Sequence, residues 1–273
     1  MNAPHSNALH VYTASAAHRQ LPYTVRLEWG LDGARTVTSG VDLAVVVDVL
    51  SFSTCVSVAL DRGAQVFPYP WKDPSAEDFA AHVHAELAGP RNGGGLSLSP
   101  ASLRAADSLK RVVLPSPNGS ALCHLLAGEV PLVAAVCLRN AAATADWVAA
   151  NLPEDAVIAV VAAGERWPDG TLRPAVEDQI GAGAFIAGLV AAGKGGYEAG
   201  DGRHGYSPEA VAAAAVFEAA EPRLREMLHG CSSGRELAGS GYAGDIDIAA
   251  ELDDSDAVAI LVDGAFSSSP AHS

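Results

Sequence analysis

The chain has 273 residues, of which 49% are hydrophobic, and its formal net charge is −15. This length and composition allow a full hydrophobic core, in one large domain or two small ones. The negative charge repels nucleic acid and anionic membranes, which excludes both as expected partners, and an anionic substrate would need a local positive site.

The first half of the chain alternates between strand-like and helix-like segments. In chain order the patterns predict a hairpin with strands at 25–29 and 36–38, a strand at 43–49, a helix at 53–62, a strand at 65–69, a helix from Ser75 to Gly89, a loop at 90–100, a short helix at 101–109 and a strand at 111–114. Gly63 stands where a C-terminal helix cap belongs. Ser75-Ala76-Glu77-Asp78 resembles a capping box.

The second half continues this alternation. The patterns predict a helix after the loop 115–120, a strand at 132–137, a helix at 141–151, a strand at 157–162, a polar loop at 164–174, a helix from about Glu177, helices from Ser207, from Pro222 and around Gly234, and strands near 245–248 and 258–262. Strands that alternate with helices favour an α/β fold. We therefore expect a largely parallel sheet flanked by helices (α/β/α), with a C-terminal α+β portion packed beside it.

Composition along the chain suggests four regions. They are a peripheral or disordered segment at 1–22, a main α/β domain at 23–193, a flexible glycine-rich loop at 194–206, and C-terminal helices and strands at 207–265 that complete the fold. Four cysteines lie far apart, which predicts buried thiols in a reducing cytoplasm rather than a zinc site. No apolar run reaches the roughly 18 residues that a membrane span needs.

Polar clusters follow several predicted strands directly. They are Asp48 with Ser51, Ser53 and Thr54; Asn118-Gly119-Ser120; Arg139-Asn140; and Gly164-Glu165-Arg166. Ligands of open α/β sheets bind at the carboxyl ends of the strands. If the strands are parallel, all four clusters lie on one edge of the sheet, where a carboxylate can hold a hard cation and helix N-termini can hold an anion.

Each cluster also has a structural interpretation. Asp48 is equally a helix cap or a cation ligand, and the second Asp that haloacid-dehalogenase phosphatases require two residues later is Leu50 here. Asn118-Gly119-Ser120 fits an ordinary turn or a phosphate cradle. Glu177-Asp178, on the first turn of a helix, fits dipole-favoured acids or metal ligands. Glycines in the same helix allow close packing against the sheet or a partner, which leaves a homodimer open.

The order of several motifs resembles the 2-phosphosulfolactate phosphatase family. The matching blocks are Val47-Asp48-Val49-Leu50 with Ser53-Thr54, Gly63-Ala64, Leu87-Ala88-Gly89 with Arg91-Asn92-Gly93, Ser99-Pro100, Asn118-Gly119-Ser120, Asn140-Ala141, Ala163-Gly164, Glu177-Asp178 with Ala182-Gly183, and Gly234-Arg235 with Leu237, Gly241 and Asp245. The resemblance implies an α/β/α phosphatase that depends on Mg²⁺ and converts 2-phosphosulfolactate to sulfolactate and phosphate, a step toward coenzyme M.

By this resemblance we expect a cytoplasmic enzyme that acts on a small anionic phosphate ester. Asp48 with Glu177 or Asp178 is expected to hold Mg²⁺ and carry catalysis. Residues expected to bind phosphate or substrate are Ser53, Thr54, Asn118, Gly119, Ser120, Asn140, Arg139, Arg166 and Arg235. The last three are alternatives for a second anionic group.

Five positions depart from the family pattern. An Arg is replaced by Ser51, an acid by Pro90, a Gly and an Asn by Ser97 and Leu98, and a His by Ser233. Three alternatives therefore stay open: a phosphatase of the same mechanism for another phospho-hydroxy acid, a degenerate member that binds an anion without turnover, and an acidic structural domain. The last of these predicts no pocket at the strand ends.

Overall fold

Ten strands form one sheet in the computed structural model, which describes residues 16–71, 73–196 and 204–268. The strands are β1 (Tyr23–Trp29), β2 (Leu43–Val47), β3 (Gln65–Tyr69), β4 (Glu86–Leu87), β5 (Arg111–Pro115), β6 (Leu132–Val136), β7 (Ile158–Ala162), β10 (His204–Tyr206), β11 (Ala259–Val262) and β12 (Ala265–Ser268). Their order across the sheet is β10-β1-β7-β2-β6-β11-β12-β3-β5-β4. A separate antiparallel hairpin pairs β8 (Glu165–Arg166) with β9 (Leu172–Arg173).

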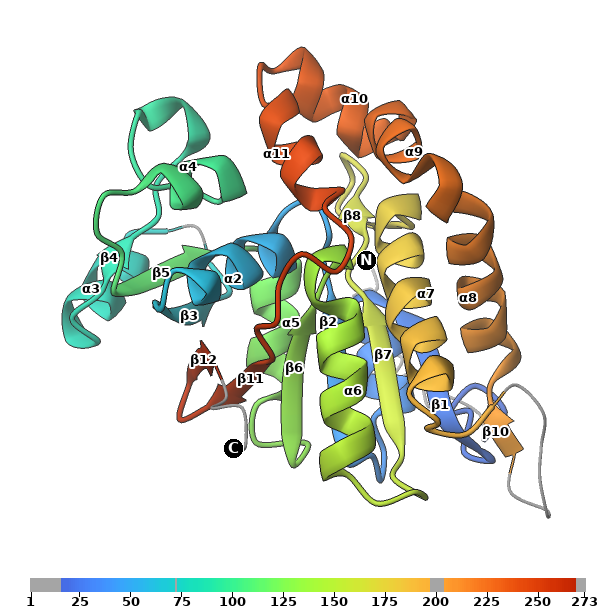
Figure 1. Ribbon diagram of the computed structural model, residues 1–273. Coiled ribbons are helices and arrows are strands. Elements are labelled where there is room, and N and C mark those ends of the chain that lie inside the picture. The colour runs from blue at the N-terminus through green and yellow to red at the C-terminus, as the bar shows by residue number, and fades with distance from the viewer. Residues whose placement is uncertain (1–15, 72, 197–203, 269–273) are drawn as a thin grey trace, which may run out of the picture.

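Helices join and cover these strands (Figure 1). They are α1 (Gly30–Val37), α2 (Phe52–Asp61), α3 (Ser75–His82), α4 (Pro100–Ala105), α5 (Gly119–Leu126), α6 (Ala141–Asn151), α7 (Val176–Ala191), α8 (Pro208–Ala220), α9 (Leu224–Gly230), α10 (Ser232–Gly239) and α11 (Ala243–Ala249), with 3₁₀ turns at Arg91–Gly93, Leu138–Asn140 and Glu221–Arg223. None of the described helices combines the length and apolar character that a membrane crossing requires.

The sheet consists of two parallel blocks joined by one hairpin. Strands β10, β1, β7, β2 and β6 are parallel, as are β3, β5 and β4. Between the blocks, β11 and β12 pair antiparallel with each other and with β6 and β3. The predicted α/β class is therefore confirmed, but the C-terminal hairpin lies within the sheet and not beside it.

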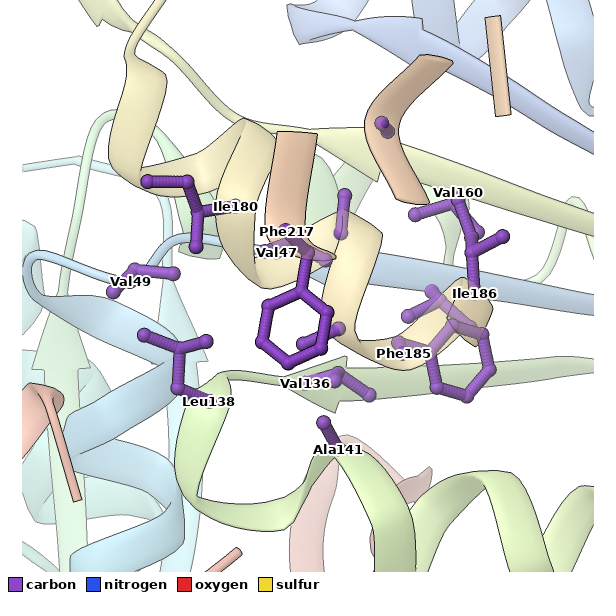
Figure 2. Packing of buried hydrophobic residues seen from close by; sticks show 14 of the residues in the cluster. Val47, Val49, Val136, Leu138, Ala141, Val160, Ile180, Phe185, Ile186 and Phe217 are labelled. Carbon is purple, nitrogen blue, oxygen red and sulfur yellow. The ribbon is translucent and has the colours of Figure 1, made fainter. Parts of the chain in front are cut away.

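The core forms two layers because the central strands are buried on both faces. In β2, Val45 and Val47 face one hydrophobic cluster, whereas Ala44 and Val46 face another, as the two-residue period of a strand requires. Helices α6, α7 and α8 contribute to the first cluster, which includes Ile180 and Phe185 of α7 and Phe217 of α8 (Figure 2). Helices α1, α2 and α5 contribute to the second.

Three predicted elements are wrong. Residues after β1 form helix α1 and not a hairpin, because Gly30, Ala34 and Val37 recur on one buried helical face. The helix predicted to end at Gly89 stops at His82, since His84 takes a left-handed φ of 50° and the chain turns into β4. The strand predicted near 245–248 is helix α11, which buries Ile246 and Ala249.

The ends of two predicted regions lie partly outside the described residues. Of segment 1–22, residues 1–15 are not described, and Gln20 is buried with its amide bonded to the backbone of Leu27 in β1. Of loop 194–206, residues 197–203 are not described, and 204–206 form strand β10. The predicted strands at 65–69, 111–114 and 132–137 and the helices at 53–62 and 141–151 are confirmed to within a few residues.

Helix α7 packs closely at two of its glycines: Gly181 lies against Val47 and Val49 at the sheet, as expected, and Gly183 lies against helix α8, which was not predicted. A Cβ atom on Gly183 would lie 2.0 Å from the Ala213 carbonyl oxygen, so the two helix backbones touch here. We expect Gly183→Ala to lower the free energy of unfolding by about 3 kcal/mol, because the helices must separate. Urea denaturation measures this loss. Gly244→Ala, on α11 with open space around it, is the control and should be neutral or slightly stabilising.

Candidate functional site

Asp48 lies at the carboxyl end of β2, and its carboxylate caps two helices at once. Oδ1 accepts hydrogen bonds from the backbone N–H groups of Ser51, at 2.9 Å, and Phe52, at 3.1 Å, at the start of α2. Oδ2 accepts one from the Gly119 N–H, at 2.9 Å, at the start of α5. The sequence left cap and cation ligand as alternatives, and the structure shows that Asp48 is a cap whose remaining surface faces a pocket.

Gly119 is required by this arrangement. A Cβ atom there would lie 2.3 Å from the Phe52 ring and 2.8 Å from Asp48 Oδ2. The start of α5 therefore approaches Asp48 as closely as backbone can. Because its N–H donates to Asp48, the amide that the sequence suggested for phosphate binding is already used.

The pocket at Asp48 has a volume of about 370 Å³ and mixed charge. Three carboxylates, those of Asp48, Glu165 and Glu236, line it together with three arginines, namely Arg91, Arg166 and Arg173. Helices α10 and α11 arch over this end of the central strands, next to β8 (Figure 1). A structural domain without a pocket at the strand ends is thereby excluded.

The negative charges of the Asp48 and Glu165 carboxylates repel each other in the pocket. Burial and the charge of Glu165 raise the pKa of Asp48 to about 6, against the lowering effect of its three backbone hydrogen bonds. Glu165 is held in place by Asn118, whose Nδ2 donates to Glu165 Oε2 at 3.1 Å. A positive ion between Asp48 and Glu165 would relieve the repulsion that raises this pKa.

Arg91 reaches the pocket from the loop between β4 and α4. Its Nη2 donates to Ser51 Oγ, its Nε lies 3.3 Å from Asp245 Oδ2, and its guanidinium lies 5.6 Å from the centre of the Tyr242 ring. The position where the family pattern has an Arg thus holds a serine that accepts a hydrogen bond from another arginine.

Arg173 and Arg166 come from the β8–β9 hairpin. Arg173 Nη2 donates to Ser233 Oγ at 3.0 Å, and its guanidinium lies 5.8 Å from the centre of the Trp167 ring. Arg166 Nη1 donates to the Gly170 carbonyl at 3.2 Å within the same hairpin. Of the arginines that the sequence nominated, Arg166 is therefore the one that lines the pocket.

Glu177 and Asp178 are buried behind the pocket and do not line it. Asp178 Oδ1 accepts from the Val49 N–H and Oδ2 from the Gly164 N–H, both at 2.8 Å, so this carboxylate joins the loops after β2 and β7. Burial, then the charges of Asp48 and Glu177, raise the pKa of Asp178. The structure gives Asp178 a role in positioning the loop that carries Asp48.

Four other side chains that were expected to bind phosphate or substrate form hydrogen bonds with nearby backbone groups instead. All four are fully buried: Ser53 bonds to the backbone of Asp48 and Val46, Thr54 to that of Val49, Ser120 to that of Leu114, and Asn140 to that of Cys137, Ala135 and Ala257. Such side chains shape the strand-end turns. The structure does not bring them to the pocket.

Two nominated arginines also lie away from the pocket. The Arg139 guanidinium is buried and pairs with Asp61 at 2.7 Å, with Asp254 at 3.1 Å and with Glu251. Arg235 is exposed on α10 and does not line the pocket. Arg91 and Arg173 line the pocket, whereas Arg139 and Arg235, which the sequence suggested, do not. Arg91 could have been proposed from the sequence because it is an arginine within the predicted loop 90–100. Glu165 could have been proposed because it belongs to the polar cluster Gly164-Glu165-Arg166.

Of the three expected Mg²⁺ ligands, only Asp48 lines the pocket, and Glu165, which was not among them, lies there with it. Among the described residues no group of three or more His, Cys, Asp or Glu side chains is arranged to hold a metal. Mg²⁺, however, needs only one or two carboxylates, with water and phosphate oxygens completing its shell. Asp48 and Glu165 share the pocket and repel each other, and they provide this donor set. The four cysteines are buried, and burial raises the pKa of each thiol.

Comparisons with known proteins match most of this chain. The family model for 2-phosphosulpholactate phosphatase matches residues 34–264. A probable 2-phosphosulfolactate phosphatase of Deinococcus radiodurans is 30% identical over 232 residues, which cover 82% of this chain and 89% of that protein. One from Gloeobacter violaceus is 29% identical over 222 residues, which cover 78% of this chain and 85% of that protein. The matched range includes every pocket residue discussed above.

Proposed function

This chain belongs to the 2-phosphosulfolactate phosphatase family of hydrolases, and on that premise we propose that it hydrolyses 2-phosphosulfolactate to sulfolactate and phosphate with Mg²⁺. The observation that supports this proposal most strongly is the pocket itself. In a chain of net charge −15, three arginines line the same pocket as the carboxylates of Asp48, Glu165 and Glu236. Such a pocket suits a cation and a substrate with several acid groups.

Asp48 and Glu165 are the residues that would hold Mg²⁺. Asp48 is fixed in orientation by three backbone N–H donors, and Glu165 is oriented by Asn118. Oδ1 accepts two hydrogen bonds and Oδ2 accepts one, so a lone pair on Oδ2 remains for an ion. When bound, Mg²⁺ supplies positive charge that neutralises phosphoryl oxygens. Arg166, next to Glu165 in the chain, adds a second positive charge for the phosphoryl group.

A substrate panel tests the proposal. Phosphate release is measured with 2-phosphosulfolactate, with other phospho-hydroxy acids such as 2-phospholactate, and with isopropyl phosphate, each with and without Mg²⁺. We expect the highest kcat/KM for 2-phosphosulfolactate and no release after chelation of the metal. A higher kcat/KM for another phospho-hydroxy acid would favour the open alternative of a changed substrate. Binding without any release would favour a degenerate member.

Mg²⁺ binding should depend on pH through Asp48. The pKa of about 6 means that Asp48 is ionised above this pH and protonated below it. We therefore expect MgCl₂ to raise the melting temperature by a few degrees at about pH 8 and hardly at all at about pH 5, since only the ionised carboxylate binds the ion. Differential scanning fluorimetry without substrate measures this shift.

Variants assign the ligands in the same measurement. Asp48→Asn and Glu165→Gln should lose the Mg²⁺-dependent shift, whereas Glu129→Gln, at an exposed site, should keep it. Glu177→Gln should also keep it, because Glu177 does not line the pocket. An equal shift at both pH values, or its loss in Glu177→Gln alone, would contradict the assignment.

A further inference from the structure

Two of the arginines that line the pocket, Arg91 and Arg173, have N–H donors without an acceptor among the described residues. Arg91 donates through Nε and Nη2 to Asp245 and Ser51, and Arg173 donates through Nη2 to Ser233. A guanidinium carries five N–H donors, so each retains donors for a ligand. Within the described part of the chain, Arg173 pairs with no carboxylate, in contrast to Arg139 with its three.

Both arginines are positioned by the segment 231–245. Ser233, at the start of α10, accepts from Arg173, while Tyr242 and Asp245, at the start of α11, contact Arg91. The same segment adds Glu236, Leu237 and Ser240 to the pocket lining, with the Glu236 side chain largely exposed. Helices α10 and α11 therefore fix the direction of two cationic groups that point into one pocket.

Aromatic rings hold the two guanidinium groups further. The Tyr242 ring lies 5.6 Å from Arg91, and the Trp167 ring lies 5.8 Å from Arg173. A guanidinium next to a ring keeps its edge, which carries the N–H donors, available for an acid group. Arg91 and Arg173 are thus oriented before a ligand binds, which reduces the entropy that binding costs.

From this arrangement we propose that Arg91 and Arg173 form the subsite for the two acid groups that accompany the phosphate, a carboxylate and a sulfonate. The inference rests on the proposed function for the identity of the substrate. It assigns the phosphoryl group to the side of the pocket with Asp48, Glu165 and Arg166, and the remaining acids to the side roofed by α10 and α11. Ser51 belongs to this subsite, because its hydroxyl oxygen accepts a hydrogen bond from Arg91. The arginine that the family pattern has at position 51 would repel Arg91.

The test separates binding of the acid groups from hydrolysis. Isothermal titration calorimetry measures the affinity for sulfolactate, which has both acid groups and no phosphate. We expect Arg91→Gln and Arg173→Gln each to weaken this affinity roughly 10- to 100-fold, the loss that follows from removing a charge-assisted hydrogen bond. Arg223→Gln, an exposed change of the same charge, should leave the affinity within about twofold.

Kinetics provide the second readout. Against 2-phosphosulfolactate, both variants should lose kcat/KM by a similar factor, mainly through a higher KM. Against isopropyl phosphate, which lacks both acid groups, the loss of kcat/KM should be much smaller than against 2-phosphosulfolactate. Each variant's melting temperature is checked against that of Arg223→Gln, so that misfolding is recognised.

The outcomes are distinct. Sulfolactate binding that depends on both arginines, in an enzyme that releases no phosphate, would refute the proposed function and keep the subsite. Sulfolactate affinity unchanged in both variants would overturn the subsite, even if 2-phosphosulfolactate is hydrolysed.

Discussion

Replacing Asp48 with Asn is expected to lower kcat by about 1,000-fold or more, which corresponds to roughly 4 kcal/mol of transition-state stabilisation. The amide is uncharged and cannot serve with Glu165 as a cation site. Its nitrogen also faces the Gly119 N–H, which needs an acceptor. Phosphate release from 2-phosphosulfolactate under saturating Mg²⁺ measures the effect.

Asp107→Asn is the matched control for this variant. Asp107 is exposed and does not line the pocket, so the same chemical change should leave kcat within about twofold. Circular dichroism must show that Asp48→Asn keeps the fold. A folded Asp48→Asn protein with more than a tenth of the wild-type kcat would remove Asp48 from the active site and leave it a helix cap only.

Replacing Arg139 with Met is expected to lower the free energy of unfolding by about 3 kcal/mol without changing the kinetics of the folded protein. The Arg139 guanidinium is buried and joins Asp61 of α2 to Glu251 and Asp254 of the segment after α11. Without it, three carboxylates lie close together with no buried counter-charge. Urea denaturation measures the stability, and kcat/KM below the transition measures the activity.

Arg104→Met provides the comparison. Arg104 also pairs with Glu251, at 2.5 Å, but its side chain is 41% exposed, so its loss should cost less than about 1 kcal/mol. If Arg139→Met instead lost substrate affinity and kept its stability, Arg139 would bind substrate as the sequence suggested.

Local patterns predicted the frame of the site well. The apolar run that ends at Asp48 is a buried strand followed by a helix, and the alternation after it gave the α/β class. Asp48 and Asn118 could be nominated because each directly follows a strand. Periodicity failed where a helix was short, as in α1 and α11, because two turns give few buried positions.

The residues that line the pocket were harder to predict, because the sequence does not show which polar side chains already have hydrogen-bond partners in the fold. Ser53, Thr54 and Ser120 have the composition of an anion site, but each bonds to a backbone carbonyl. Arg173 lies within a polar loop whose folding into a hairpin brings it to α10. Such contacts join segments up to 154 residues apart, as Arg91 and Asp245 show, and no local pattern encodes them.

Helix N-termini serve an unexpected purpose in this fold. The sequence suggested that the starts of α2 and α5 would cradle phosphate, yet their N–H groups donate to Asp48. Backbone amides thus help to keep a buried carboxylate ionised near neutral pH, in opposition to burial and Glu165. In the function that we propose, the positive charge for the substrate comes from arginines and a cation instead.

A crystal structure with Mg²⁺ and inorganic phosphate tests the central claim most directly, because it locates the cation and the anion together. We predict the cation between the carboxylates of Asp48 and Glu165, with the phosphate beside it and facing Arg166. A cation held by Glu177 and Asp178, or a phosphate bound outside the pocket that Asp48 lines, would contradict the account.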